Sequence, residues 1–184
     1  MNKRINKVVV LGSGIMGSRI ACHFANIGVE VLLLDIAPKE LSAEEELKGL
    51  VLTHPAVKNR IVNAALQNTV KTNPSPIYSQ SVLKRISTGN FEDDMPKIAN
   101  YDWIIEVVVE NLGIKQKVFE QVEQFRKPGT LVTSNTSGIP IHLMAEGRSE
   151  DFKKQHSGRC FLPNKGKYGI QLFYIDRLNQ LPGK

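Results

Sequence analysis

The chain has 184 residues, of which 41% are hydrophobic and 23% are charged, a balance typical of a folded globular protein rather than a disordered one. This length predicts one large domain that can bury a core of its own. A net charge of +6 without a basic run interleaved with aromatic residues argues against a nucleic-acid partner, and no apolar stretch approaches the length of a membrane span.

The first predicted strand, residues 8–11, is an apolar β-branched run that leads directly into glycines. Gly12, Gly14 and Gly17 follow the spacing G-x-G-x-x-G, and a helical pattern runs from residue 18 to about 27. Such a loop lets the backbone approach a pyrophosphate, which then lies at the positive end of the helix. The alternative is a glycine-rich turn without a ligand, and the strand and helix on either side make it the weaker interpretation.

A second apolar run, residues 30–34, ends in Asp35, which lies 21 residues after Gly14. This is close to the spacing of about 20 expected for a carboxylate that binds a ribose. A carboxylate at that place accepts hydrogen bonds from a ribose 2′-hydroxyl and repels a 2′-phosphate, so it favours NAD over NADP. Residues 5–35 therefore predict a βαβ unit, with continuous apolar strands typical of a parallel sheet covered on both faces.

Two helices are predicted next, over residues 40–52 and 56–66, with a break at Pro55. This is more helix than a simple crossover needs, so we expect an inserted helical arm at about residues 39–72. Lys58 in this arm either binds an anionic part of a substrate or lies on a solvated face, and solvated faces are the commoner case.

The rest of the predicted domain alternates strands and helices. We expect a weak strand over residues 82–88, a short helix over 91–100, a central strand over 102–109, a helix over 113–126 and a strand over 130–133. Glu110 and the polar loop 134–138 follow two of these strands. Ligands of open α/β sheets bind at the carboxyl ends of the strands, which places both segments in the ligand-binding layer. Ser137 also fits as the cap of a helix over 139–145.

Three separated motifs occur in this order: residues 5–35, the run Val-Val-Val-Glu-Asn-Leu-Gly-Ile-Lys at 107–115, and Ser-Asn-Thr-Ser at 134–137. Together they resemble the NAD-binding domain of 3-hydroxyacyl-CoA dehydrogenases over about residues 5–152. The resemblance implies an α/β, Rossmann-type doubly wound, mostly parallel sheet with an inserted helical arm. It also implies NAD-dependent oxidation of L-3-hydroxyacyl-CoA to 3-ketoacyl-CoA in fatty-acid β-oxidation.

The resemblance assigns roles to particular residues. It implies NAD contacts from Gly12, Ser13, Gly14, Ile15, Met16, Gly17, Asp35, Glu110, Lys115 and Ser137. It implies an acyl-CoA substrate held near Ser137 and, in an arm of variable length, near Lys58. It implies no metal.

The family's catalytic histidine lies in a Gly-x-His-Phe-Phe-Asn-Pro strand and accepts the proton of the substrate hydroxyl. At the matching place, residues 158–164 read Gly-Arg-Cys-Phe-Leu-Pro-Asn, so Cys160 occupies the histidine position. The glutamate expected about a dozen residues later is replaced by Leu172. An unperturbed thiol has a pKa of about 8.5 and is a poor base near neutral pH.

We therefore expect an NAD-binding domain over residues 1–152 and a divergent tail over 153–184. The C-terminal helical domain, which in the family carries the homodimer interface and completes the substrate pocket, is expected to be absent. The tail is a truncated or frame-disrupted sequence, or a divergent one with His142 or His156 as the base, or a segment with a new binding role. For His156, an exposed polar residue is the commoner alternative.

The predicted function is that of an incomplete dehydrogenase with little or no activity, and the alternative is a non-catalytic NAD-binding module. A different Rossmann dehydrogenase family is disfavoured by Glu110 and by residues 134–137. Without a signal peptide or a disulfide framework, the chain is expected to be cytoplasmic. Cys22 is expected to be a small core residue.

Overall fold

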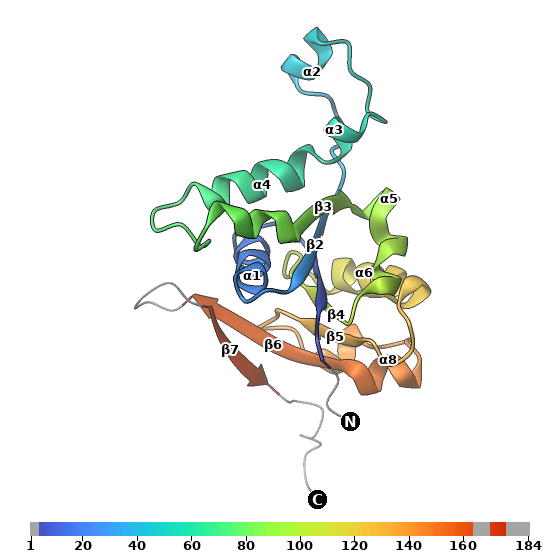
Figure 1. Cartoon of the computed structure of the whole chain (residues 1–184). Helices are drawn as coiled ribbons and strands as arrows, with labels where there is room; N and C mark the ends of the chain where they lie inside the picture. The colour runs from blue at the N-terminus through green and yellow to red at the C-terminus, as the bar shows by residue number, and fades with distance from the viewer. Residues whose placement is uncertain (1–3, 164–169, 176–184) are drawn as a thin grey trace, which may run out of the picture.

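The computed structural model describes residues 4–163 and 170–175, with side chains to residue 156 (Figure 1). Its strands form a single seven-stranded sheet in the order β3-β2-β1-β4-β5-β6-β7. The strands are β1 (Lys7–Leu11), β2 (Glu30–Asp35), β3 (Ile86–Asn90), β4 (Trp103–Glu106), β5 (Leu131–Ser134), β6 (His156–Pro163) and β7 (Ile170–Ile175). All neighbours pair in parallel except β6 and β7, which are antiparallel. The predicted doubly wound, mostly parallel fold is confirmed.

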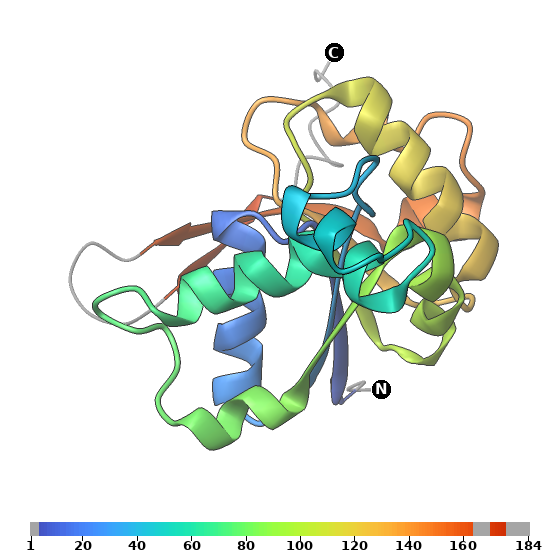
Figure 2. The same ribbon diagram turned by 90° about the horizontal axis from the view of Figure 1, so that it is seen from above.

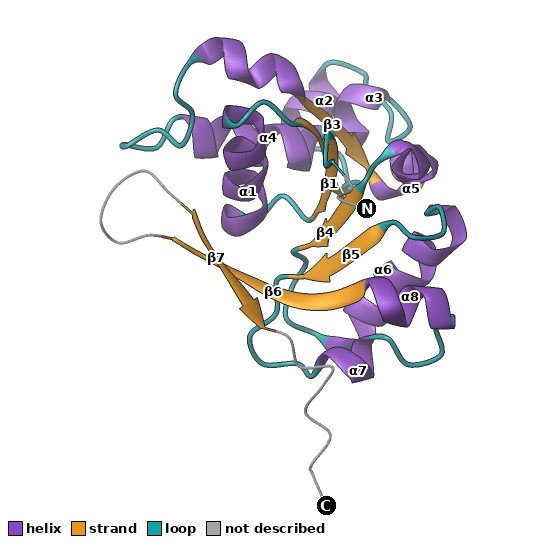
Figure 3. Ribbon diagram, turned by 60° about the horizontal axis from the view of Figure 1, so that its bottom comes forward, coloured by secondary structure: helices purple, strands orange, loops and turns teal. Residues whose placement is uncertain are grey.

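Helices cover both faces of this sheet (Figure 3). On one side lie α1 (Ile15–Asn26) and α4 (Arg60–Val70), and on the other α6 (Leu112–Phe125) and α8 (Glu150–Gln155). Shorter elements are α2 (Ala43–Leu47), α3 (Pro55–Lys58), η1 (Gln80–Arg85), α5 (Phe91–Asp94), η2 (Met95–Asn100) and α7 (Ile141–Met144). Within the described residues, no helix has the length and hydropathy needed to cross a bilayer.

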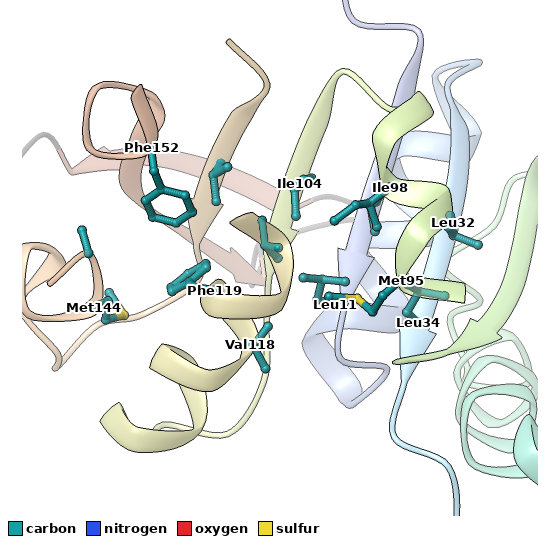
Figure 4. Close-up of a cluster of buried hydrophobic side chains, with 14 of the residues drawn as sticks. Leu11, Leu32, Leu34, Met95, Ile98, Ile104, Val118, Phe119, Met144 and Phe152 are labelled. Carbon is teal, nitrogen blue, oxygen red and sulfur yellow. The ribbon is translucent and has the colours of Figure 1, made fainter. Parts of the chain in front are cut away.

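The core has two halves because side chains alternate between the faces of a strand. Val9 and Leu11 of β1 point into one cluster with Phe119 of α6, and Figure 4 shows Leu11 and Phe119 in it. Val8 and Val10 point into the other, against α1. A continuous apolar run is therefore buried on both sides, as expected for a central parallel strand.

The predicted arm leaves the sheet after β2. Figure 1 shows α2 and α3 projecting beyond the strands, and Figure 2 looks onto them from above. The first arm helix is shorter than predicted and begins at a capping box, in which the Ser42 hydroxyl accepts from the Glu45 amide and the Glu45 carboxylate accepts from the Ser42 amide. Leu47 and Val51 at its end are largely exposed.

Other local predictions were also wrong. The central strand predicted over 102–109 ends at Glu106. Helix α1 begins at Ile15, three residues before the predicted start, because Gly14 already serves as its N-cap. Residues 82–85 of the predicted third strand belong to the 3-10 helix η1, and the strand runs over Ile86–Asn90 instead. Ser137 does not cap a helix: it is exposed, and the N-cap of α7 is Pro140.

Candidate functional site

Two glycines of the loop after β1 are required by the fold itself. Gly12 has a φ of 104°, and a Cβ there would lie 2.7 Å from the carbonyl oxygen of Val107 in the neighbouring chain segment. A Cβ on Gly17 would lie 1.8 Å from the carbonyl oxygen of Gly12. These positions bring the loop against the end of β4 and bring α1 close to the strand it follows.

The middle glycine differs from these two, because its surroundings are open. A Cβ on Gly14 would meet nothing within 4 Å. Within the described chain, the amides of Gly14, Ile15 and Met16 donate no hydrogen bond, and the Ile15 side chain is 77% exposed. Unpaired amides at the start of a 12-residue helix, facing empty space, form a cradle suited to a pyrophosphate.

The predicted carboxylate closes the other side of this cradle. Asp35 Oδ2 accepts hydrogen bonds from the Ser13 amide, at 2.6 Å, and from the Ser13 hydroxyl. Its Oδ1 accepts from the Ile36 amide at 2.7 Å. The side chain is only partly buried and lines a cavity, so this carboxylate lies at the rim of the site rather than in the core.

That cavity has a volume of about 430 Å³ and lies at the carboxyl ends of β1, β2 and β4. We call it the switch-point cavity, because strand order reverses between β1 and β4, where ligands of such sheets bind. Its lining is Gly12, Gly14, Asp35, Ile36, Phe91, Val107, Val108, Val109, Ile114, Lys117, Val118 and Gln121.

Glu110 and the loop after β5 come together as predicted. Glu110 Oε1 accepts hydrogen bonds from the Thr136 hydroxyl, at 2.5 Å, and from the Gly138 amide, at 3.1 Å. Burial alone would raise the pKa of Glu110, but these hydrogen bonds and the Lys115 ammonium lower it below its usual value. Ser137 lies exposed between the two donors.

The predicted Lys115 is fully buried and joins two carboxylates. Its Nζ lies 2.8 and 3.0 Å from the two carboxylate oxygens of Glu106 and 3.3 Å from Glu110 Oε2. Glu106, the last residue of β4, is also fully buried and accepts hydrogen bonds from the Ser134 hydroxyl and the Val108 amide. Burial raises the pKa of Glu106, and the nearby Lys115 opposes this.

The role of Glu106 was not predicted from the sequence. The signal was present: a carboxylate stands inside an otherwise apolar run of residues 103–109, and a buried charge requires a partner.

Lys58, expected near the substrate, lies beside a second cavity of about 740 Å³ between the arm and α5. Its ammonium is 2.7 Å from Asp93 and 3.1 Å from Glu92. Hydrogen bonds to these carboxylates raise the pKa of Lys58. Lys58 is therefore already paired, and an anionic ligand would have to compete with two carboxylates.

The candidate bases do not gather at the switch-point cavity. His142 is exposed on α7. The expectation that His156 is exposed was wrong: it is 1% exposed, packs its ring 4.7 Å from that of Phe119 and 5.1 Å from that of Phe152, and burial lowers its pKa to about 4. Cys160 lies in β6, opposite Phe173 of β7, and its side chain lies outside the described residues.

Cys22 is a buried core residue, as predicted, and burial raises the pKa of its thiol to about 11. No group of three or more potential metal ligands occurs in the part of the chain that the structure describes.

Comparisons with known proteins identify the family to which the chain belongs. Residues 7–157 match the family model described as 3-hydroxyacyl-CoA dehydrogenase, NAD binding domain. A probable 3-hydroxyacyl-CoA dehydrogenase of Bacillus subtilis (strain 168) is 51% identical over 168 residues, which are 91% of this chain and 21% of that protein. A protein of the same name from Deinococcus radiodurans is 37% identical over 86% of this chain and 42% of its own length.

Among solved structures, 3-hydroxybutyryl-CoA dehydrogenase from Escherichia coli K12 superposes with a TM-score of 0.60 at 29% identity, over 87% of this chain and 30% of that one. The chain thus spans less than half the length of each of these three relatives. The glycine loop, Asp35 and the buried end of β4 lie within the residues that match the family model. The chain belongs to the 3-hydroxyacyl-CoA dehydrogenase family and carries its NAD-binding domain.

Proposed function

We propose that the chain binds NAD across the switch-point cavity, as the cofactor domain for oxidation of L-3-hydroxyacyl-CoA to 3-ketoacyl-CoA. The observation that carries the proposal is the open cradle at Gly14, with unpaired helix amides on one side and Asp35 on the other. Bound NAD supplies the hydride acceptor for this reaction.

We assign each half of the dinucleotide to its own residues. The unpaired amides of Gly14, Ile15 and Met16 hold the pyrophosphate, and Asp35 accepts hydrogen bonds from the adenosine ribose. Glu110, Lys115 and Ser137 follow β4 and β5, on the other side of the switch point, where the nicotinamide half belongs. Under this assignment, separate groups of residues bind the adenosine half and the nicotinamide half of NAD.

The proton of the substrate hydroxyl needs a base, and the described residues supply a poor one. His156 is enclosed by aromatic rings, and the family's histidine position holds Cys160, a residue type whose ordinary pKa of about 8.5 makes it a poor base near neutral pH. We therefore propose that this chain binds NAD but turns over substrate slowly. A non-catalytic NAD-binding module is the second candidate, supported by the same observation.

The acyl-CoA site and the cellular context are also proposals. The cavity beside Lys58 has room for part of a large ligand, although Glu92 and Asp93 already neutralise this lysine. A homodimer formed through the family's C-terminal domain, and a cytoplasmic location, stay predictions from the resemblance.

Calorimetric titration of the full chain with NAD and NADP tests the first part, and binding of one NAD with weaker binding of NADP is expected. Oxidation of NADH with acetoacetyl-CoA, followed at 340 nm, tests the second part. We expect a rate far below that of a family enzyme assayed in parallel. Absence of NAD binding would overturn the proposed function, and a rate equal to that of the parallel enzyme would overturn the assignment of slow turnover.

A further inference from the structure

The interior beneath the carboxyl ends of β4 and β5 contains a continuous polar network. Glu106 accepts from the Ser134 hydroxyl and pairs with Lys115, which in turn reaches Glu110. Glu110 then accepts from Thr136 and Gly138. The network therefore leaves β5 at Ser134 and returns to the loop that follows β5 at residues 136–138.

Only one end of this network reaches the solvent. The side chains of Glu106 and Lys115 have no exposed surface, whereas that of Glu110 is 42% exposed. The Lys115 ammonium makes two hydrogen bonds to the buried Glu106 carboxylate. Its third contact, at 3.3 Å, is with the carboxylate of Glu110. The buried carboxylate thus sets the position of a residue at the surface of the site.

We propose that Glu106 is a positioning residue for the nicotinamide half of the site, acting through Lys115 on Glu110 and on the loop 134–138. The inference rests on the proposed function, and it goes further by naming a residue that itself touches no ligand. A second line connects Glu106 to the site directly, since its Oε1 accepts from the amide of Val108, a residue that lines the switch-point cavity.

The substitution Glu106→Gln tests this role, because it keeps the size of the side chain but removes its charge. Lys115 is then left with Glu110 as its one carboxylate partner among the described residues and draws that carboxylate away from Thr136 and Gly138. The hydrogen bonds and ion pairs of this network include neither the glycine loop nor Asp35, so the adenosine half keeps its anchor. ADP occupies only the adenosine half of the site. Comparing the dissociation constants of NAD and ADP therefore separates a loss of binding at the nicotinamide half from a loss at the adenosine half.

For Glu106→Gln we expect the NAD dissociation constant to rise tenfold or more and that of ADP to stay within twofold of the wild-type value. If Glu106 only stabilised the fold, the substitution would weaken the binding of NAD and of ADP by the same factor. Equal weakening of NAD and ADP, or no change in either, would overturn the proposal. A wild-type chain that binds neither ligand would instead overturn the proposed function.

Loss of a buried charge partner can prevent folding, so a milder variant is needed. Ser134→Ala removes one hydrogen bond to Glu106 and should weaken NAD about threefold while leaving ADP unchanged. Thr133→Val is the matched control, because Thr133 lies next to Ser134 on β5 but outside the network. The substitution removes the 2.9 Å hydrogen bond that the Thr133 hydroxyl accepts from the indole of Trp103 on β4. If Ser134→Ala and Thr133→Val give the same ratio of NAD to ADP affinity, the proposal is wrong.

Discussion

The buried imidazole of His156 makes the stability of this protein depend on pH. Neither of its ring nitrogens has a hydrogen-bond partner among the described residues, and its neighbours are the rings of Phe119 and Phe152. We predict that His156→Phe stabilises the fold and removes most of this pH dependence.

The magnitude follows from two terms. Buried polar atoms without partners cost ~1–3 kcal/mol, and fitting a slightly larger ring costs ~1 kcal/mol, so a gain of ~1 kcal/mol is expected near neutral pH. The pKa of His156 falls from 6.5 to about 4 on folding. The unfolded chain then binds more protons, so the free energy of unfolding of the wild type falls as the pH drops below about 6.5. Linkage gives a loss of ~2 kcal/mol between about pH 7 and pH 5.

Urea unfolding of the wild type and of His156→Phe at about pH 7 and pH 5 measures both the gain in stability and its dependence on pH. The chain has one tryptophan, Trp103, which is 6% exposed, so its fluorescence reports loss of the core. His142→Phe is the matched control, because it makes the same chemical change at an exposed site and should leave the pH dependence unaltered. The prediction is wrong if His156→Phe is less stable than the wild type at both pH values. It is also wrong if the stability of the variant falls as steeply as that of the wild type when the pH is lowered from 7 to 5.

Other predictions concern the cradle. Gly14→Ala fits the free protein and should leave the melting temperature unchanged, but its methyl group occupies the space assigned to the pyrophosphate, so NAD should bind at least ~10-fold more weakly. The methyl group of Gly17→Ala would clash with the carbonyl oxygen of Gly12, so this variant should lose ~3 kcal/mol of unfolding free energy in urea. Equal stability of the Gly14→Ala and Gly17→Ala variants would contradict the loop geometry. Asp35→Asn removes the charge that repels a 2′-phosphate, so the preference for NAD over NADP in calorimetry should fall by ~10-fold; an unchanged preference would assign the discrimination to another residue.

The architecture could be predicted because its signals are local. The continuous apolar run of residues 8–11 is typical of a strand buried on both faces, and glycines at fixed spacing mark a turn that bulkier residues cannot make. The start of β3 was predicted too early because residues 82–85 carry no pattern that separates a 3-10 turn from a strand. Pairing with β2 decides that boundary, and pairing is a property of the fold rather than of the segment.

The site was predictable to the extent that its residues follow strand ends. Glu110 and the loop 134–138 were placed at one edge of the sheet by that rule, and Asp35 by its spacing from Gly14. In the structure all of them lie at that edge. The burial of His156 could not be predicted from the sequence in this way. Its burial comes from Phe119 and Phe152, which belong to different helices, and the polar sequence around it gives no sign of that contact.

Glu106 shows how the sequence rule can be extended. A charged residue inside an apolar strand has to be neutralised, and in a parallel sheet the partner comes from the helix that follows the strand or from the neighbouring strand. Here both contribute: Lys115 lies nine residues later on α6, and Ser134 lies beside Glu106 in the parallel register of β4 and β5. The sequence already assigned Lys115 to the proposed cofactor site. Pairing Lys115 with Glu106, the charged residue inside the apolar strand, would have connected that site to the core.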